Sequence, residues 1–400
     1  MKYRSYILKR KIEDVLLLPF IAIGRLLAYL KPLDKAYETF YFFPFYHTGG
    51  AEKVHALITQ ATGNNRCIIF FTRKSADDNF YDDFVQSNCT IKNIAAYTDN
   101  KWLYFMNLIY RGMISGYINR QTLQPLVFNG QCNFGYKISP WIKTQVPQIE
   151  LIHSFNTFSL IRLPFLPFIS KTVMISKLRI EDHLKQYQSL EVPQHFNNKI
   201  EYIVNGIQLP QQHFTKSYEV PLQVLYVGRG TGEKRVHFIA KMAAEAANKK
   251  LQVQFIFMGD VAGAIPAHLL PYCKLLGSKK DTAEIESVYQ QAHVVIITSS
   301  TEGFPMVIEE GMAHGCTILS TPVGDVPYHV KHGINGFLFS SVNDEAVIIE
   351  EGIGYLTRLC EHKNMLVEMG ETNRNYAIEH FGIEAFNNKY TELFNQLRKQ

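Results

Sequence analysis

Several kinds of site and segment are missing from this chain of 400 residues. Its six cysteines lie far apart without a Cys-x-x-Cys pair, which argues against a zinc site and against a disulfide framework. Histidines at metal-ligand spacing are also lacking, so we expect no bound metal and no cofactor. The apolar stretch over residues 15–24 falls short of the about 20 residues that a membrane-spanning helix needs. A reducing cytoplasmic compartment fits this composition.

Composition and charge narrow the class of protein further. With 46% apolar and 19% charged residues, the chain is globular and long enough for two domains of ordinary size. The net charge is +5, and the first 40 residues hold eight Lys or Arg against four Asp or Glu. Because this basic excess lies beside apolar residues rather than in a stripe with stacking aromatics, nucleic-acid binding is disfavoured.

The N-terminal segment, residues 1–37, combines the basic cluster with residues 15–24 and then Arg25. Two alternatives stay open for it. One is an interfacial helix that binds an anionic membrane surface on the inner face of the cytoplasmic membrane. The other is a helix docked on its own domain. A second apolar run, residues 160–169, either joins an exposed patch with this segment or packs in the core.

The most informative stretch covers residues 300–315. A strand over residues 293–298, apolar enough to be buried on both faces, precedes a turn made by Gly303 and Pro305, and a helix follows that ends near Gly315. Unpaired N–H groups at such a helix start favour an anion such as a diphosphate. Glu302 and Glu310 flank this junction, and carboxylates beside an anion site are suited to hydroxyl groups. The pattern therefore suggests a site for a sugar nucleotide.

A second loop with phosphate chemistry follows the predicted strand over residues 222–227. The loop runs from Gly228 to Arg235 and contains two well-spaced cations, Arg229 and Lys234. Arg229 can fork onto phosphate oxygens and Lys234 supplies a compact charge, which suits a diphosphate leaving group. The loop matches neither a dinucleotide-binding fingerprint nor a Walker A loop.

The first half of the chain offers two more candidate positions. Gly49 and Gly50 lie between a strand-like aromatic run over residues 38–45 and an amphipathic helix, where paired glycines allow close approach of a ligand. His153 stands at the end of a predicted strand, at the edge where ligands of doubly wound sheets collect. A core histidine is the alternative for His153.

Glu302 and Glu310 resemble the Glu-x7-Glu signature of retaining GT-B type glycosyltransferases, the group 1, family 4-like enzymes. The resemblance implies an α/β fold with two doubly wound Rossmann-like domains facing a central cleft. The expected parts are an acceptor-side domain over 38–205, a linker over 206–221, a donor domain over 222–377, and a terminal helix over 378–400 that crosses back to the first domain.

The resemblance also implies an activity and its residues. The expected enzyme moves a hexosyl or related sugar from a nucleotide-sugar to a hydroxyl of a glycan or lipid-linked acceptor, as in surface glycan or polysaccharide biosynthesis. It works without a metal, since the chain also lacks the Asp-x-Asp cradle of metal-dependent glycosyltransferases. A GT-B type nucleotide-sugar epimerase and an inactive nucleotide-sugar-binding module are the alternatives. The implied catalytic residues are Glu302, His153, Arg229 and Lys234, and the donor-binding residues are Gly49, Gly50, Gly228, Arg229, Lys234, Gly303, Phe304, Pro305, Met306 and Glu310.

Overall fold

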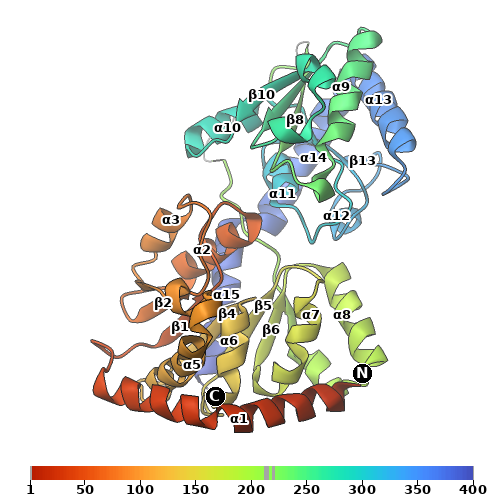
Figure 1. The fold of residues 1–400 in the computed structure, drawn as a ribbon. Helices are drawn as coiled ribbons and strands as arrows, with labels where there is room; N and C mark the ends of the chain where they lie inside the picture. Colours follow the sequence, from red (N-terminus) through yellow and green to blue (C-terminus); the bar gives the residue numbers. More distant parts are fainter. Residues whose placement is uncertain (1, 211–215, 219–220, 400) are drawn as a thin grey trace. The chain divides into compact units, whose positions relative to one another are not determined.

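A computed structural model describes residues 2–210, 216–218 and 221–399 of the chain, which divides into two compact units. Unit 1 holds the residues up to Val204 together with those from Phe386 onward, and unit 2 holds Asn205–Ala385. Each unit is a parallel sheet with helices packed on both faces (Figure 1). The doubly wound α/β architecture predicted from the sequence is therefore confirmed for both units.

Unit 1 contains a seven-stranded sheet in the order β3-β2-β1-β4-β5-β6-β7, with every pairing parallel. Four of the strands are buried at every position, as expected for a parallel sheet that helices cover on both faces. The strands are β1 Thr39–Phe43, β2 Cys67–Phe71, β3 Thr90–Asn93, β4 Leu126–Gly130, β5 Gln148–Ile152, β6 Lys171–Met174 and β7 Ile200–Tyr202. The helices are α1 Tyr3–Leu30, α2 Gly50–Thr62, α3 Tyr81–Val85, α4 Ala95–Thr98, α5 Tyr104–Asn119, α6 Asn133–Ile138, α7 Phe158–Ile161, α8 Lys177–Ser189 and α15 Ile383–Arg398.

Unit 2 repeats the design with a six-stranded parallel sheet in the order β10-β9-β8-β11-β12-β13. The chain reverses its direction of winding between β8 and β11, which are neighbours in this sheet. Ligands of such sheets bind where the strand order reverses, at the carboxyl ends of the strands. The strands are β8 Leu222–Val227, β9 Val253–Met258, β10 Cys273–Gly277, β11 Val294–Ile297, β12 Thr317–Ser320 and β13 Gly336–Leu338, and the helices are α9 Val236–Asn248, α10 Thr282–Gln291, α11 Met306–Ala313, α12 Val326–His329, α13 Glu345–Glu361 and α14 Lys363–Phe381.

The segment over residues 206–221, predicted as a linker, is in part packed on unit 2. The backbone N–H of Ile207 donates to the carbonyl of Phe381 at 2.9 Å, and the buried Lys216 donates to the carbonyls of Tyr289 and Ala292. Residues 211–215 and 219–220 of this segment lie outside the described residues. The segment was predicted as a linker from its Pro and Gln content, but some of its residues belong to the fold of unit 2.

The terminal helix α15 contributes most of its length to unit 1. The ring of Phe394 stacks on Tyr41 of β1 at 6.2 Å, and Arg398 donates to the hydroxyl of Thr39 at 2.6 Å. Residues from the far end of the sequence thereby complete the core around the first strand of the sheet.

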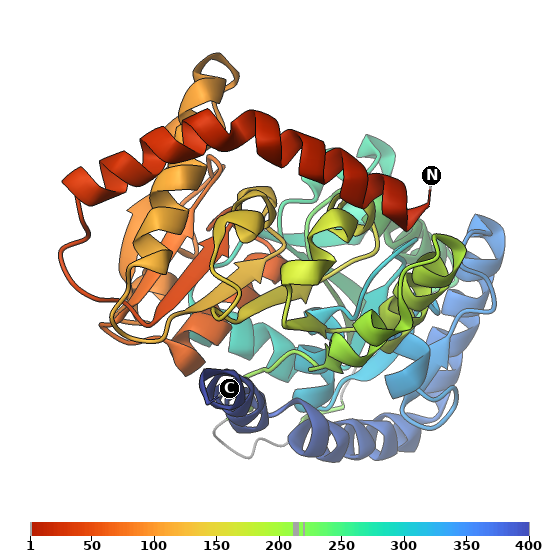
Figure 2. The same cartoon turned by 90° about the horizontal axis from the view of Figure 1, so that it is seen from below.

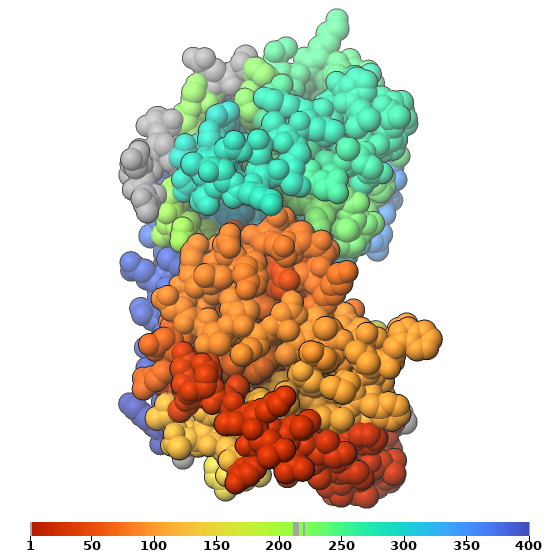
Figure 3. Space-filling model, turned by 60° about the vertical axis from the view of Figure 1, so that its left-hand side comes forward, coloured from red at the N-terminus to blue at the C-terminus, as the bar shows by residue number. Residues whose placement is uncertain are grey.

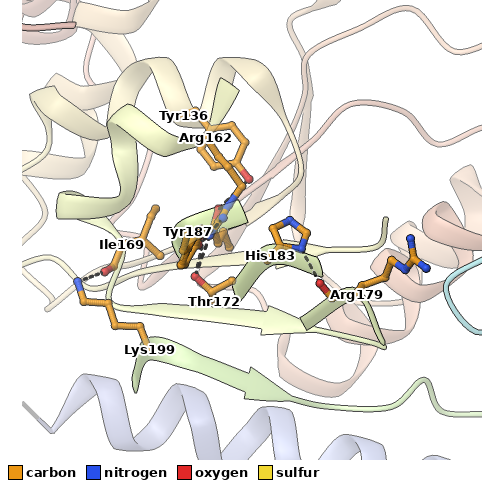
Figure 4. A network of polar contacts seen from close by, with 9 residues as sticks. Tyr136, Arg162, Ile169, Thr172, Arg179, His183, Tyr187 and Lys199 are labelled. Carbon is orange, nitrogen blue, oxygen red and sulfur yellow. Dashed lines mark hydrogen bonds and ion pairs between the residues drawn. The ribbon is translucent and has the colours of Figure 1, made fainter. Parts of the chain in front are cut away.

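The apolar run over residues 160–169 is mostly core, so its exposed-patch alternative is wrong for most of the run. Leu163, Phe165 and Leu166 are buried, and Arg162 is buried as well, where it meets the buried carboxylate of Glu150. Arg162 Nε lies 3.0 Å from Glu150 Oε2, and its guanidinium also reaches toward the hydroxyls of Thr172 and Tyr187 (Figure 4). A buried charge needs such partners, which is why the run folds inward around Arg162.

Most of the N-terminal segment forms one helix, α1, which packs on unit 1 and lies across it in two perpendicular views (Figures 1 and 2). It crosses α5 closely. A Cβ on Gly24 would lie 2.1 Å from the carbonyl oxygen of Ile109, and one on Gly112 would lie 2.3 Å from that of Ile21. Glycine at both positions is therefore what allows the two backbones to meet. Among the residues that the structure describes, each helix is either too short or too polar to serve as a transmembrane span.

Candidate active site

The loop after β8 and the loop after β11 are joined by hydrogen bonds in unit 2. Ser300 N–H donates to the carbonyl of Glu233 at 2.8 Å, and Arg235 Nε donates to the carbonyl of Thr298 at 2.7 Å. The hydroxyl of Thr298 donates in return to the carbonyls of Lys234 and Arg235, each at 3.1 Å. These bonds fix the glycine-rich loop against the start of the Glu-x7-Glu segment.

Lys234 and Glu302 form an ion pair within this junction. Lys234 Nζ lies 2.5 Å from Glu302 Oε1, and the hydroxyl of Ser299 donates to the same oxygen at 2.7 Å. The side chains of Lys234 and Glu302 are 24% and 14% exposed, so the pair can reach a ligand while it is screened from bulk water. The structure therefore brings together two of the predicted catalytic residues, which are 68 positions apart in the sequence.

Arg229 lies in the same loop but differs from Lys234 in its surroundings. Its side chain is exposed, while its carbonyl accepts a hydrogen bond from the buried hydroxyl of Tyr226 at 2.9 Å. Gly228 precedes it with a φ of +150°, and a Cβ there would lie 2.9 Å from the Tyr226 hydroxyl. The loop backbone is thus held by Tyr226, and the guanidinium of Arg229 projects from a fixed base.

The turn before α11 is also held by a glycine with positive φ. Gly324 has a φ of +54°, and a Cβ there would lie 1.9 Å from the carbonyl oxygen of Gly303. The same carbonyl accepts a hydrogen bond from the N–H of Asp325 at 2.8 Å. The loop over residues 321–327 therefore supports the predicted donor-binding turn.

The helix α11 begins at Met306, with Pro305 as its N-cap residue, two residues after the buried Phe304. Phe304 stacks on the ring of His329 at 4.2 Å and holds the turn in the core. The first N–H groups of a helix have no partner within that helix, and the dipole there is positive. The sequence-predicted set Gly303, Phe304, Pro305 and Met306 thus forms one helix start that can receive an anion.

Glu310 is half-buried inside α11 and has its own partner. Its Oε2 accepts a hydrogen bond from the hydroxyl of Tyr289, on α10, at 2.6 Å. Burial, and then the neighbouring Glu310 carboxylate, raise the pKa of Tyr289 well above its usual value, so the phenol stays a donor. Glu302 and Glu310 therefore sit in different settings, one beside a cation and one beside a phenol.

Gly49 and Gly50 open helix α2 in unit 1, as the sequence predicts for the glycine pair. Gly50 has open space around it, whereas a Cβ on Gly49 would lie 2.1 Å from Glu52 Oε2. Glu52 occupies the first turn of α2, and its carboxylate lies 3.8 Å from His47 Nε2. Of the two glycines, Gly50 offers the open approach to the start of the helix.

His153 follows β5 and meets a second histidine that the sequence reasoning missed. Its Nε2 lies 2.9 Å from Nε2 of His55, which is buried on α2 and stacked on Phe43 at 4.4 Å. Burial lowers the pKa of His153 to about 4 and lowers the pKa of His55 well below its usual value. Both rings are therefore neutral near pH 7, and a single proton lies between the two nitrogens.

Three supporting residues were not found from the sequence: Ser299, Tyr289 and His55. Ser299 lies only three positions before Glu302, so the short distance in sequence could have indicated that its hydroxyl reaches the carboxylate. Tyr289 and His55 lie 21 and 98 positions from their partners, and no spacing rule points to them. Among the residues that the structure describes, no group of three or more His, Cys, Asp or Glu could hold a metal ion. The metal-independent mechanism stays a prediction.

One protein-family model matches part of the second unit. Residues 221–356 match the family model described as glycosyl transferases group 1. This range contains Arg229, Lys234, Glu302 and Glu310, and the match confirms the resemblance drawn from the sequence.

Curated relatives are similar over part of their length. The N-acetyl-alpha-D-glucosaminyl L-malate synthase of Bacillus anthracis is 28% identical over 127 residues, 32% of this chain and 31% of that protein. The D-inositol 3-phosphate glycosyltransferase of Segniliparus rotundus is 26% identical over 188 residues, 42% of this chain and 41% of that protein. The chain thus spans about a third of the length of the curated relatives it matches.

Solved structures extend the similarity to nearly the whole chain at the level of the fold. HepE of Anabaena, solved in complex with UDP-glucose, has a TM-score of 0.70 at 16% identity and covers 90% of this chain and 99% of its own. The lipopolysaccharide outer core galactosyltransferase WaaB has a TM-score of 0.66 at 17% identity, with 90% and 99% covered. The fold is the GT-B fold.

Proposed function

We propose that this chain, whose residues 221–356 form a group 1 glycosyltransferase domain, moves a sugar from a nucleoside diphosphate sugar to a hydroxyl acceptor with retention of configuration. The observation that carries the proposal is the Lys234–Glu302 ion pair, which joins two loops at the carboxyl ends of the neighbouring strands β8 and β11. Ligands of open parallel sheets bind at this edge.

The charges of the reaction match the charges of the site. As the bond between the anomeric carbon and the diphosphate oxygen breaks, negative charge grows on the phosphate and positive charge grows on the sugar ring. Lys234, Arg229 and the start of α11 supply positive charge and N–H donors for the departing phosphate. Glu302 accepts hydrogen bonds from hydroxyls of the donor sugar and stabilises the positive ring once the ammonium of Lys234 has the phosphate as a second partner.

Glu310 would hold the nucleoside end of the donor. A carboxylate has two oxygens for the two neighbouring hydroxyls of a ribose, and the Tyr289 hydroxyl fixes the orientation of this one. Glu310 then contributes to binding of donor and product alike, whereas Glu302 acts on the sugar that is transferred.

The acceptor-side residues of the proposal lie in unit 1. His153, kept neutral by burial, would exchange a hydrogen bond with a sugar or acceptor hydroxyl without adding a positive charge. Gly49 and Gly50, at the start of α2, are the proposed donor-binding residues of this unit. Attack from the face that the phosphate leaves gives retention, and the phosphate oxygen takes the acceptor's proton, so the chemistry needs no metal.

The pathway is proposed from the same comparisons. HepE was solved with UDP-glucose, so uridine diphosphate sugars are the first donors to test. We place the reaction on the cytoplasmic side, in the assembly of a surface glycan, a polysaccharide or a lipid-linked saccharide.

A panel of nucleotide-sugars tests the function. The full chain is expected to be stabilised thermally by one donor, to release nucleoside diphosphate from it, and to do so faster when a hydroxyl acceptor is present. Nuclear magnetic resonance of the product should show the anomeric configuration of the donor. An inverted product would overturn retention, and an epimerised sugar formed without acceptor would favour the epimerase alternative. Absence of binding to every donor would overturn the function itself.

A further inference from the structure

Helix α1 is apolar on two opposite sides, and only one of them is covered by unit 1. Its buried residues are Tyr3, Arg10, Ile21, Gly24 and Ala28, which lie on the side packed against α5 and neighbouring segments. Turned away from them is a row at helical spacing, which we name the apolar stripe: Leu8, Ile12, Leu16, Ile23, Leu26 and Leu30. All six are exposed, Leu16 by 69%. A contiguous row of exposed large apolar side chains marks an interaction surface, so the stripe calls for a partner.

The inner side of α1 is firmly held. Tyr3 N–H donates to the carbonyl of Leu190 at 2.8 Å, Phe20 stacks on Phe105 at 5.8 Å, and the hydroxyl of Tyr117 donates to the carbonyl of Lys31 at 2.7 Å. The two alternatives for the N-terminal segment are therefore not exclusive. Because the inner side is docked on unit 1, the outer side is held as a fixed surface. Its length is about 42 Å, since the helix has 28 residues that each rise about 1.5 Å.

The charged side chains of α1 are also divided between its two sides. Its two acids are engaged away from the stripe, where Asp14 pairs with the buried Arg10 at 3.0 Å and Glu13 lies 3.5 Å from Lys137. Its cations Arg4, Lys9 and Lys11 are exposed, whereas the guanidinium of Arg25 donates to the carbonyl of Trp141 in unit 1 at 3.1 Å. The space-filling view shows atoms of α1, in red, at the surface of unit 1 (Figure 3). An apolar row edged by positive charge, with the acids turned elsewhere, suits the headgroup region of an anionic bilayer.

We propose that the apolar stripe of α1 docks flat on an anionic membrane surface, with the stripe among the acyl chains and the cations at the lipid phosphates. A second copy of the chain fits less well, because pairing two such faces would bring exposed cations of like sign together. The docking does not rest on the proposed function, since unit 2 takes no part in it.

Vesicle co-sedimentation of the full chain tests the docking. The natural chain should bind vesicles of phosphatidylcholine and phosphatidylserine at low salt and should bind pure phosphatidylcholine much more weakly. Leu16→Glu with Ile23→Glu, in the middle of the stripe, should weaken binding at least tenfold, because a carboxylate would enter the acyl region. Lys9→Glu with Lys11→Glu should weaken binding roughly thirtyfold or more at low salt, since each basic residue near the surface contributes separately.

The matched control replaces exposed apolar residues of unit 2, Ile334→Glu with Ile378→Glu, and should bind vesicles as the natural chain does. Removing α1 altogether would uncover the core around Ile21, so point variants with unchanged thermal unfolding are the proper comparison. Absence of vesicle binding by the natural chain, or equal binding by the stripe variant, would overturn the proposal. A dimer in light scattering that the stripe variant dissociates, without vesicle binding, would assign the face to a second copy and would also overturn it.

Discussion

Replacing Lys234 with alanine is expected to cost far more turnover than stability. The pair with Glu302 is 24% and 14% exposed, which places it between exposed pairs and fully buried ones. Exposed pairs contribute up to about 1 kcal/mol, and breaking fully buried pairs costs about 3–5 kcal/mol, so we expect a loss of about 1–2 kcal/mol in the free energy of unfolding. Ser299 still donates to Glu302 in the variant, which limits the loss.

The loss of turnover follows from the leaving group. Removal of one preorganised donor that stabilises developing negative charge typically costs about 10²–10³ in rate, or about 2.7–4 kcal/mol. Turnover is measured as release of nucleoside diphosphate, and stability as denaturant unfolding of the same preparations. The matched control is Lys241→Ala, which breaks an exposed pair with Glu345 in the same unit. It should keep its turnover and lose at most about 1 kcal/mol of stability.

A double variant with Glu302→Gln separates the roles of the pair. For unfolding, the second substitution should add little once the first has broken the pair, since residues in contact are not additive. Lys234→Ala with the expected loss of stability but near-normal turnover would show that the ammonium only ties two loops together. The assignment of Lys234 to the phosphate would then be wrong.

Two further predictions concern the remaining polar pairs. Glu310→Gln and Tyr289→Phe should both weaken binding of free nucleoside diphosphate in calorimetry. Glu302→Gln should leave that binding unchanged and lower the rate with the full donor. Equal losses of affinity for the two glutamate variants would contradict the division of roles. His153 has a pKa of about 4 when folded, against about 6.5 unfolded, so its contribution to stability is complete above pH about 6.5 and is lost as the pH falls toward 4. His153→Gln should reduce the change in the free energy of unfolding with pH in this range. An unchanged slope would show that another group is responsible for the pH dependence.

The parts of the fold that follow from local patterns were predictable. Largely apolar runs such as residues 222–227 indicate strands covered on both faces, and glycine-rich turns after them indicate the edge where ligands bind. The junction at residues 302–306 was predictable for the same reason, because a strand, a turn and a helix follow each other directly in the sequence. These features depend on residues that are neighbours in the sequence.

Partners that come from different elements were not predictable. The contact between His55 and His153 depends on how α2 packs over the end of β5, and the contact between Tyr289 and Glu310 depends on how α10 packs beside α11. Helix packing sets such pairs through side-chain shape, which leaves no periodic signal in either segment. The sequence could therefore name His153 and Glu310 but not the groups that orient them.

Helix α1 shows why an apolar pattern alone can mislead. Its residues 15–24 are apolar on every side, so periodicity did not reveal that the segment belongs to one long helix with a covered side and an exposed side. The distinction comes from small residues: Gly24 and Gly112 let two backbones meet, which fixes one side of α1 inward. The exposed stripe is then a consequence of packing, since any residue opposite Gly24 must point away from unit 1. Filling the contact with Gly24→Leu should accordingly detach α1 and lower stability, while Leu16→Glu should leave stability unchanged, and thermal unfolding of the two variants compares the two sides of the same helix directly.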